Sequence, residues 1–236
     1  MAGVKPRRAQ ESHTHPELTS SSGGSGDPTQ RIYRSWNGQQ GDGNPFALSL
    51  AGSNITSSDQ GFSGTVLDGR MGAWVSATTA TRYAYTEPYV WVTRGFEARV
   101  QFGWTASSGT TKAFIGLTTT TTGLEHETWS TTAEYSVGVT ATVGSAFEWS
   151  SALAAGSGVQ TTSSTTCALN TMFDLQLSCP PGGPVTGVLT DLEARTSESF
   201  EFPTAPDDRL LRLSFKADSS TSHKPKVCRM DVVERL

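Results

Sequence analysis

The segment from Gly95 to Thr118 constrains the fold of this chain more than any other part of its sequence. Every second residue in its first half is apolar, and these residues are Phe96, Ala98, Val100 and Phe102. Because successive side chains of a strand point to opposite faces of a sheet, this alternation predicts a strand buried on one face only. A polar turn at residues 107–110 and a second apolar run, Lys112–Thr118, follow. The segment therefore predicts two consecutive β-strands.

The rest of the chain repeats this plan and contains few segments with helical periodicity. Its apolar runs are short and are separated by clusters of Gly, Ser, Pro and Asp, which is typical of an all-β sandwich or barrel. The further predicted strands are Gly64–Leu67, Met71–Ala77, Arg82–Tyr85, Tyr89–Val92, Tyr135–Thr140, Ala146–Ser150, Gly158–Thr161, Met172–Leu177, Val185–Asp191, Glu198–Phe202, Arg209–Lys216 and Val227–Glu234. The aromatic residues expected in the core are Trp74, Trp91, Phe102, Phe114, Phe147, Trp149, Phe173 and Phe215.

Composition divides the chain into three regions. Residues 1–30 form a polar arm rich in Pro, Gly and Ser, with too few apolar residues to pack by itself. Residues 31–58 are a turn-rich transitional segment with aromatic anchors, and residues 59–236 contain the predicted sandwich. Since ordering such an arm costs conformational entropy, we expect it to be ordered only where a neighbouring protein supplies contacts.

Four segments, in this order, resemble the lectin-like (concanavalin-type) β-jelly-roll domain found at the carboxyl ends of many tailed-phage virion proteins. They are Gly95–Arg99, Lys112–Thr118, Phe173–Gly182 and Val227–Leu236. The resemblance implies a concanavalin-like jelly-roll sandwich with an extended N-terminal arm. It also implies a place in a tail fibre, a tail tip or a head decoration, because the domain occurs in all of these.

The arm contains a basic cluster and one sharp motif, which are expected to contact other virion proteins. The basic cluster is Lys5, Arg7 and Arg8, and the motif is His13-Thr14-His15. In an extended strand both imidazoles lie on the same side, so one chain offers two ligands and a homotrimer offers six nitrogens, enough for a transition metal. The motif resembles the His-x-His sites that bind iron in phage tail fibres. A contact between subunits without metal is the alternative, and no other cofactor is expected.

Sugar binding is the main functional expectation for the sandwich. Lectin sites combine an aromatic face, which stacks on a sugar ring, with hydrogen-bonding groups. Four aromatic residues near predicted turns are candidates, namely Trp36, Tyr85, Trp104 and Trp129. Trp104 is the strongest because it follows Gly103 at the end of a predicted strand. Each of the four could instead cover the rim of the core or a subunit contact. No calcium-binding loop is recognisable.

Enzymatic and nucleic-acid-binding functions are disfavoured by the sequence. Glycoside hydrolysis needs two carboxylates that face each other across a cleft, and no strand shows alternating acidic residues. The nearest cluster, Glu125–Glu127, is expected to be a solvated loop. The net charge is −4 and the basic residues are dispersed outside the arm, so nucleic acid is not an expected partner. An active site assembled from distant residues is left open.

Cysteine spacing argues against a zinc-binding protein, and hydropathy argues against a membrane-inserted one. Cys167, Cys179 and Cys228 lack the paired short spacings of zinc sites, and we expect buried thiols, with a single disulfide left open. Neither a signal peptide nor an apolar run of transmembrane length is present, which predicts no insertion into a membrane.

These observations predict a non-enzymatic structural protein on the exterior of a phage virion, assembled in the host cytoplasm. We expect a homotrimer whose arm holds the particle and whose jelly roll faces outward. A tail fibre or tail tip that attaches to a host-surface glycan is favoured. The first alternative is a capsid decoration or head-fibre protein, and the second is a polysaccharide-cleaving enzyme.

Overall fold

A computed structural model gives the fold of the chain. It describes residues 31–36, 49–51, 66–67, 70–71, 80–85, 90–105, 112–119, 135–153, 158–203, 208–219 and 224–235. The predicted arm lies outside these residues, together with Lys5, Arg7, Arg8, His13 and His15.

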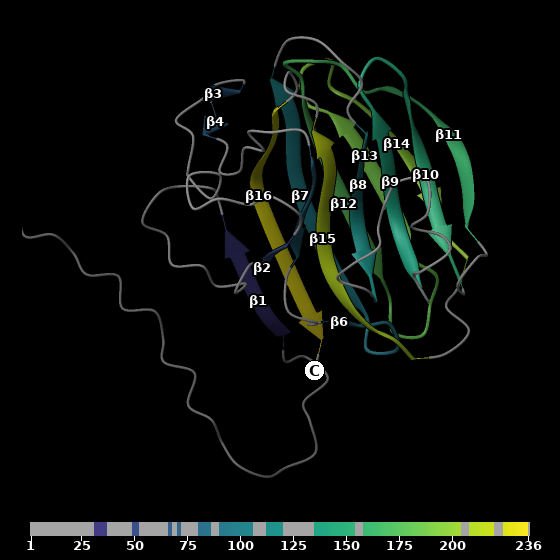
Figure 1. The fold of residues 1–236 in the computed structure, drawn as a ribbon. Coiled ribbons are helices and arrows are strands. Elements are labelled where there is room, and N and C mark those ends of the chain that lie inside the picture. The colour runs from purple at the N-terminus through teal and green to yellow at the C-terminus, as the bar shows by residue number, and fades with distance from the viewer. Residues whose placement is uncertain are drawn as a thin grey trace, which may run out of the picture.

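The first sheet has six antiparallel strands in the order β1-β16-β7-β12-β13-β14 (Figure 1). Its strands are β1 (Arg31–Trp36), β16 (Lys224–Arg235), β7 (Phe96–Thr105), β12 (Met172–Cys179), β13 (Thr186–Asp191) and β14 (Thr196–Glu201). Both β1 and β14 are edge strands of this sheet.

The second sheet has eight strands, of which seven follow the order β11-β10-β9-β8-β15-β5-β2 and β6 pairs with β15. Its strands are β11 (Val159–Thr166), β10 (Ala146–Ala152), β9 (Ser136–Thr142), β8 (Lys112–Thr118), β15 (Leu210–Ser219), β5 (Ala80–Tyr85), β2 (Ser49–Ala51) and β6 (Val90–Trp91). A separate pair joins β3 (Val66–Leu67) to β4 (Arg70–Met71). The described chain contains no helix long and apolar enough to cross a membrane.

The core lies between the two large sheets and is dominated by aromatic rings. The alternating residues of β7 that were expected to be buried have at most 4 % of their surface exposed. Phe147 and Phe173, from opposite sheets, lie edge to face with their ring centroids 4.8 Å apart. Burying each such side chain contributes about 1.5–3 kcal/mol. Trp91 is only partly buried, and Trp74 lies outside the described residues. Phe114 is buried but is not part of the core cluster, whereas the other predicted core aromatics belong to it.

The prediction of an all-β, two-sheet fold is confirmed, and every predicted strand overlaps an observed one. The sheets also include two strands from the segment 31–58, which was predicted to be a transitional segment outside the sandwich. β1 pairs with β16 from Arg31 opposite Arg235 to Trp36 opposite Met230, and β2 pairs with β5. The sandwich therefore begins before residue 59. Local pattern could not show this, because the partner of β1 lies at the other end of the chain.

All three cysteines are free thiols and are buried, as expected. Cys167 and Cys179 belong to the main core, and burial raises the pKa of the Cys167 thiol. Cys228 packs instead against Met172 and Leu192 on the outer side of the six-stranded sheet.

Candidate functional site

The outer face of the six-stranded sheet is polar where β7, β12 and β16 lie side by side. On β7, the apolar residues point inward, so Glu97, Arg99 and Gln101 point outward. The central residue, Arg99, is directly opposite Gln176 of β12 and Asp231 of β16. Side chains from three strands that are far apart in the sequence are thereby brought into one row.

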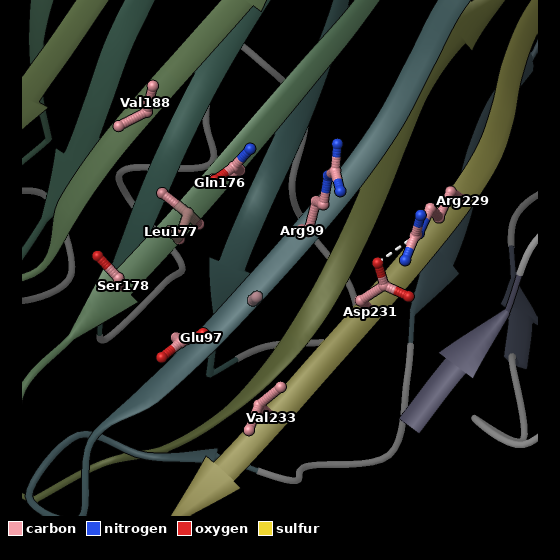
Figure 2. Close-up of a pocket in the computed structure, with 10 residues that line it drawn as sticks. Glu97, Arg99, Gln176, Leu177, Ser178, Val188, Arg229, Asp231 and Val233 are labelled. Carbon is pink, nitrogen blue, oxygen red and sulfur yellow. Dashed lines mark hydrogen bonds and ion pairs between the residues drawn. The ribbon is translucent and has the colours of Figure 1, made fainter. Parts of the chain in front are cut away.

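This face is hollowed, with a cavity volume of about 510 Å³ (Figure 2). We call this depression the polar hollow. Its lining residues are Glu97, Ala98, Arg99, Gln176, Leu177, Ser178, Val188, Arg229, Asp231 and Val233. Figure 2 shows Arg99 on β7 between Gln176 on one side and Asp231 on the other.

Arg99 is fixed in the polar hollow by a two-pronged ion pair with Asp174 of β12. Its Nε donates to Oδ1 at 2.8 Å and its Nη2 donates to Oδ2 at 2.7 Å. The Asp174 side chain is only 3 % exposed, and it also accepts a hydrogen bond from Nε2 of Gln176 at 3.0 Å. The hydrogen bond to Asp174 raises the pKa of the Arg99 guanidinium, against the lowering effect of burial. A buried carboxylate needs such partners, since burying an unpaired charge is costly.

A β-bulge in β16 places Arg229 in the polar hollow. Val227 is opposite Phe102, which points into the core, whereas Arg229 is opposite Gln101, which points outward. The extra residue, Cys228, shifts the alternation by one, so Arg229 lies on the outer face. There its Nε donates to Oδ2 of Asp231 at 2.5 Å.

The polar hollow suits an uncharged ligand with many hydroxyl groups. Together with Asp174 it contains three carboxylates and two guanidinium groups, which give a formal charge of −1. Two of the carboxylates, those of Asp174 and Asp231, are bound by arginines. The described residues include no cluster of three or more side chains suited to hold a metal ion.

The prediction that Trp104 binds sugar is wrong. Trp104 is fully buried, and its ring packs edge to face on Phe102 with centroids 5.5 Å apart. The reason is the alternation itself, because β7 continues to Thr105 and Trp104 has the same parity as Phe102. Trp36 and Tyr85 lie in β1 and β5, but their side chains are outside the described part. Trp129 is also outside it.

None of the residues that line the polar hollow is among the site residues expected from the sequence. The alternation did indicate that Glu97, Arg99 and Gln101 face away from the core, and the same holds for Asp174 and Gln176 of β12. The alternation does not show which strands are neighbours in a sheet, since β7, β12 and β16 are separated by long stretches of chain.

Comparison with solved structures identifies the fold as lectin-like. A protein of unknown function from Shewanella oneidensis MR-1 matches with a TM-score of 0.58 and 14 % identity, covering 86 % of each chain. The basic lectin of winged bean, solved with Tn-antigen, matches with a TM-score of 0.51 and 13 % identity. Lectin II from Ulex europaeus matches with a TM-score of 0.52 and 9 % identity. Both lectin matches cover 86 % of this chain and 98 % of the lectin. The concanavalin-like jelly roll expected from the sequence is thus confirmed. No protein-family model and no curated protein sequence matches the chain.

Proposed function

We propose that this protein is a non-enzymatic glycan-binding protein and that the polar hollow is its binding site. The observation behind the proposal is the network of Arg99, Asp174 and Gln176 beneath an open depression of about 510 Å³. Its fold, shared with plant lectins, supports the same class of ligand.

Sugar hydroxyls both donate and accept hydrogen bonds, and the polar hollow offers both kinds of partner. The Arg99 and Arg229 side chains are 34 % and 38 % exposed, so their guanidinium groups are accessible to a ligand. The carboxylates that hold them are at most 9 % exposed, so they fix the guanidinium groups from below. Side chains that are already fixed lose little conformational entropy on binding.

The same ion pairs argue against hydrolysis. A glycosidase needs one carboxyl group that is protonated and one that is free to act as base or nucleophile. In the polar hollow, both carboxylate oxygens of Asp174 accept hydrogen bonds from Arg99, and Oδ2 of Asp231 accepts one from Arg229, so these atoms are engaged by arginines. In this proposal the site therefore binds its ligand and releases it unchanged.

A glycan array followed by titration calorimetry tests this proposal with a matched pair of variants. Arg229→Gln and Arg195→Gln each neutralise one arginine, but Arg195 lies in the exposed turn between β13 and β14, outside the polar hollow. We expect glycans bound by the wild type to bind at least tenfold more weakly to Arg229→Gln and unchanged to Arg195→Gln. Equal binding by both variants, with equal unfolding temperatures, would refute the assignment of the site.

The biological setting that we propose is the exterior of a tailed-phage virion. There the jelly roll of a homotrimeric tail fibre or tip would attach to a host-surface glycan, and residues 1–30 would hold the particle. The support is the set of four jelly-roll segments and the composition of the arm. Light scattering of the purified protein tests for a trimer. Metal analysis of that trimer, compared with His13→Ala, tests the His13 and His15 site.

Electron cryo-microscopy of the virion then separates tail from capsid. Density for the domain at the tail tip supports attachment, and density over the capsid lattice supports the decoration alternative. Virions that show density for the domain at neither location would contradict the virion assignment. The glycan-binding proposal would then still be tested by the glycan array and calorimetry.

A further inference from the structure

A second depression lies at the side of the sandwich, where the two sheets end. Figure 1 shows β10, β11 and β14 together on the side of the sandwich away from β1. The two edges are joined by Glu198 of β14, whose Oε2 accepts hydrogen bonds from the backbone N–H of Ser164 at 2.7 Å and from its hydroxyl at 2.5 Å. Two residues from Glu198, on the same face of β14, Phe200 lines a pocket between these edges.

This small pocket has an aromatic wall, and we call it the edge pocket. Its volume is about 290 Å³, and its lining residues are Trp149, Ser151, Val159, Thr161, Phe200, Glu201, Phe202 and Pro203. Two pairs of directly opposite residues form one wall, Trp149 with Thr161 and Ser151 with Val159. All four have the orientation of core residues, but Val159 and Thr161 on β11 are exposed.

The aromatic wall is held flat by stacking. Phe200 lies parallel to Trp149, with an interplanar angle of 10° and ring centroids 5.6 Å apart. Phe202 braces both rings edge to face. The close approach of Trp149 depends on Gly187 of β13, where an added Cβ would lie 2.6 Å from the indole ring. Val159, at 57 % exposure, is the one large apolar side chain that is exposed among the described residues.

The size and chemistry of the edge pocket fit one sugar ring. A flat aromatic wall with an exposed aliphatic neighbour matches the apolar face of a pyranose. The hydroxyls of Ser151 and Thr161 and the carboxylate of Glu201 line the same pocket and can bond the ring hydroxyls. At about 290 Å³ the space is close to the lower limit of small-ligand pockets.

The edge pocket reaches the outer face of the six-stranded sheet, where the polar hollow lies, through Glu201. Ser178 lines the polar hollow and Glu201 lines the edge pocket. Between them lies a single residue, since Ser178 is opposite Thr186 and Thr186 is opposite Glu201. With strands about 4.8 Å apart, the backbones of Ser178 and Glu201 are about 10 Å apart. All three residues have hydroxyl or carboxyl groups that a glycan crossing the strands could contact.

We propose that the edge pocket is a second sugar subsite, so that the protein recognises an oligosaccharide lying across β12, β13 and β14. The inference rests on the proposed function, because it assigns the polar hollow to the same glycan. The ring in the edge pocket stacks on Phe200, and the adjoining part of the chain occupies the polar hollow.

The test compares ligand length with the variants Phe200→Leu and Phe200→Tyr. Phe200→Leu keeps an apolar side chain but removes the ring face, whereas Phe200→Tyr retains the ring. Binding is measured by calorimetry to mono-, di-, tri- and tetrasaccharides of one series, chosen as the series that the wild type binds best on a glycan array. Methyl glucoside, galactoside and mannoside are also examined by saturation-transfer NMR.

We expect Phe200→Leu to weaken binding of the tri- and tetrasaccharides about tenfold and to change binding of the monosaccharide less than twofold. Phe200→Tyr should bind every length as the wild type does. Binding by Phe200→Leu that equals the wild type at every length would overturn the subsite while leaving the polar hollow intact. If Arg229→Gln has no effect while Phe200→Leu weakens even the monosaccharide, the polar hollow fails and the edge pocket stands. If no glycan of any length binds the wild type, both proposals are refuted.

Discussion

Replacing Arg99 should destabilise this protein more than replacing Asp174, although both changes break the same ion pair. The reason is a difference in exposure, since the Asp174 side chain is 3 % exposed and that of Arg99 is 34 % exposed. In Arg99→Met the carboxylate of Asp174 stays buried and keeps the hydrogen bond that Nε2 of Gln176 donates to it at 3.0 Å. Leaving a buried charge uncompensated costs about 3–5 kcal/mol.

In Asp174→Asn the loss is smaller because water can hydrate the exposed side of the Arg99 guanidinium. The change weakens charge-assisted hydrogen bonds that are worth about 1.5–3 kcal/mol in buried settings. Because the Arg99 guanidinium is one-third exposed and solvent screens its charge, we expect Asp174→Asn to lower the free energy of unfolding by about 1–2 kcal/mol.

Urea unfolding at pH 7 measures both variants and the double variant Arg99→Met/Asp174→Asn. The double variant leaves no uncompensated charge at position 174, so we expect its cost to lie well below the sum of the single costs, with unchanged m-values. An Asp174→Asn variant that is as destabilised as Arg99→Met, or a double variant whose cost equals the sum, would refute the argument that the buried carboxylate is the group that needs compensation.

Three further changes test the core. The hydroxyl of Tyr135 is buried without a hydrogen-bond partner in the described structure. Tyr135→Phe should therefore leave the free energy of unfolding unchanged or raise it by up to about 1 kcal/mol, as measured by thermal unfolding. A loss above about 1 kcal/mol would show that the hydroxyl has a hydrogen-bond partner. Burial raises the pKa of the Cys167 thiol, so its contribution to stability is complete below about pH 8.5 and declines as the pH rises from there. Urea titrations from pH 7 to 10 should show a shallower decline for Cys167→Ala than for the wild type. A Cβ on Gly138 would lie 2.2 Å from the carbonyl oxygen of Ile115, so Gly138→Ala should lower the free energy of unfolding by about 3 kcal/mol or more. At Gly144 the φ is +87° but the space is open, so Gly144→Ala should lower it by about 1 kcal/mol.

Much of the fold could be predicted from local pattern because the chemistry of a strand is local. In β7, alternation separates Phe96 and Phe102 from Arg99, and the structure keeps that separation. The burial of the three thiols also followed from the type of residue and the absence of metal-ligand spacing. The same alternation places Trp104 on the buried face together with Phe102, whereas its position before a predicted turn suggested an exposed ring.

The candidate site could be predicted less well, because its residues meet only through strand order. Arg99, Asp174 and Asp231 are distant in sequence, and nothing in the local pattern indicates that β12 and β16 both pair with β7. The bulge at Cys228 adds a second difficulty, since reading β16 with strict alternation puts Val227 and Arg229 on the same face. The pairing of β1 with β16 was missed for the same reason.

The sequence by itself therefore determined which segments form strands and which face of each strand is apolar, because the period of two is built into every strand. The tertiary structure decided which strands are neighbours, and with that the composition of the polar hollow and of the edge pocket. Strand neighbourhood depends on contacts between residues far apart in the chain, whose free energy is gained only when both sheets close over one core.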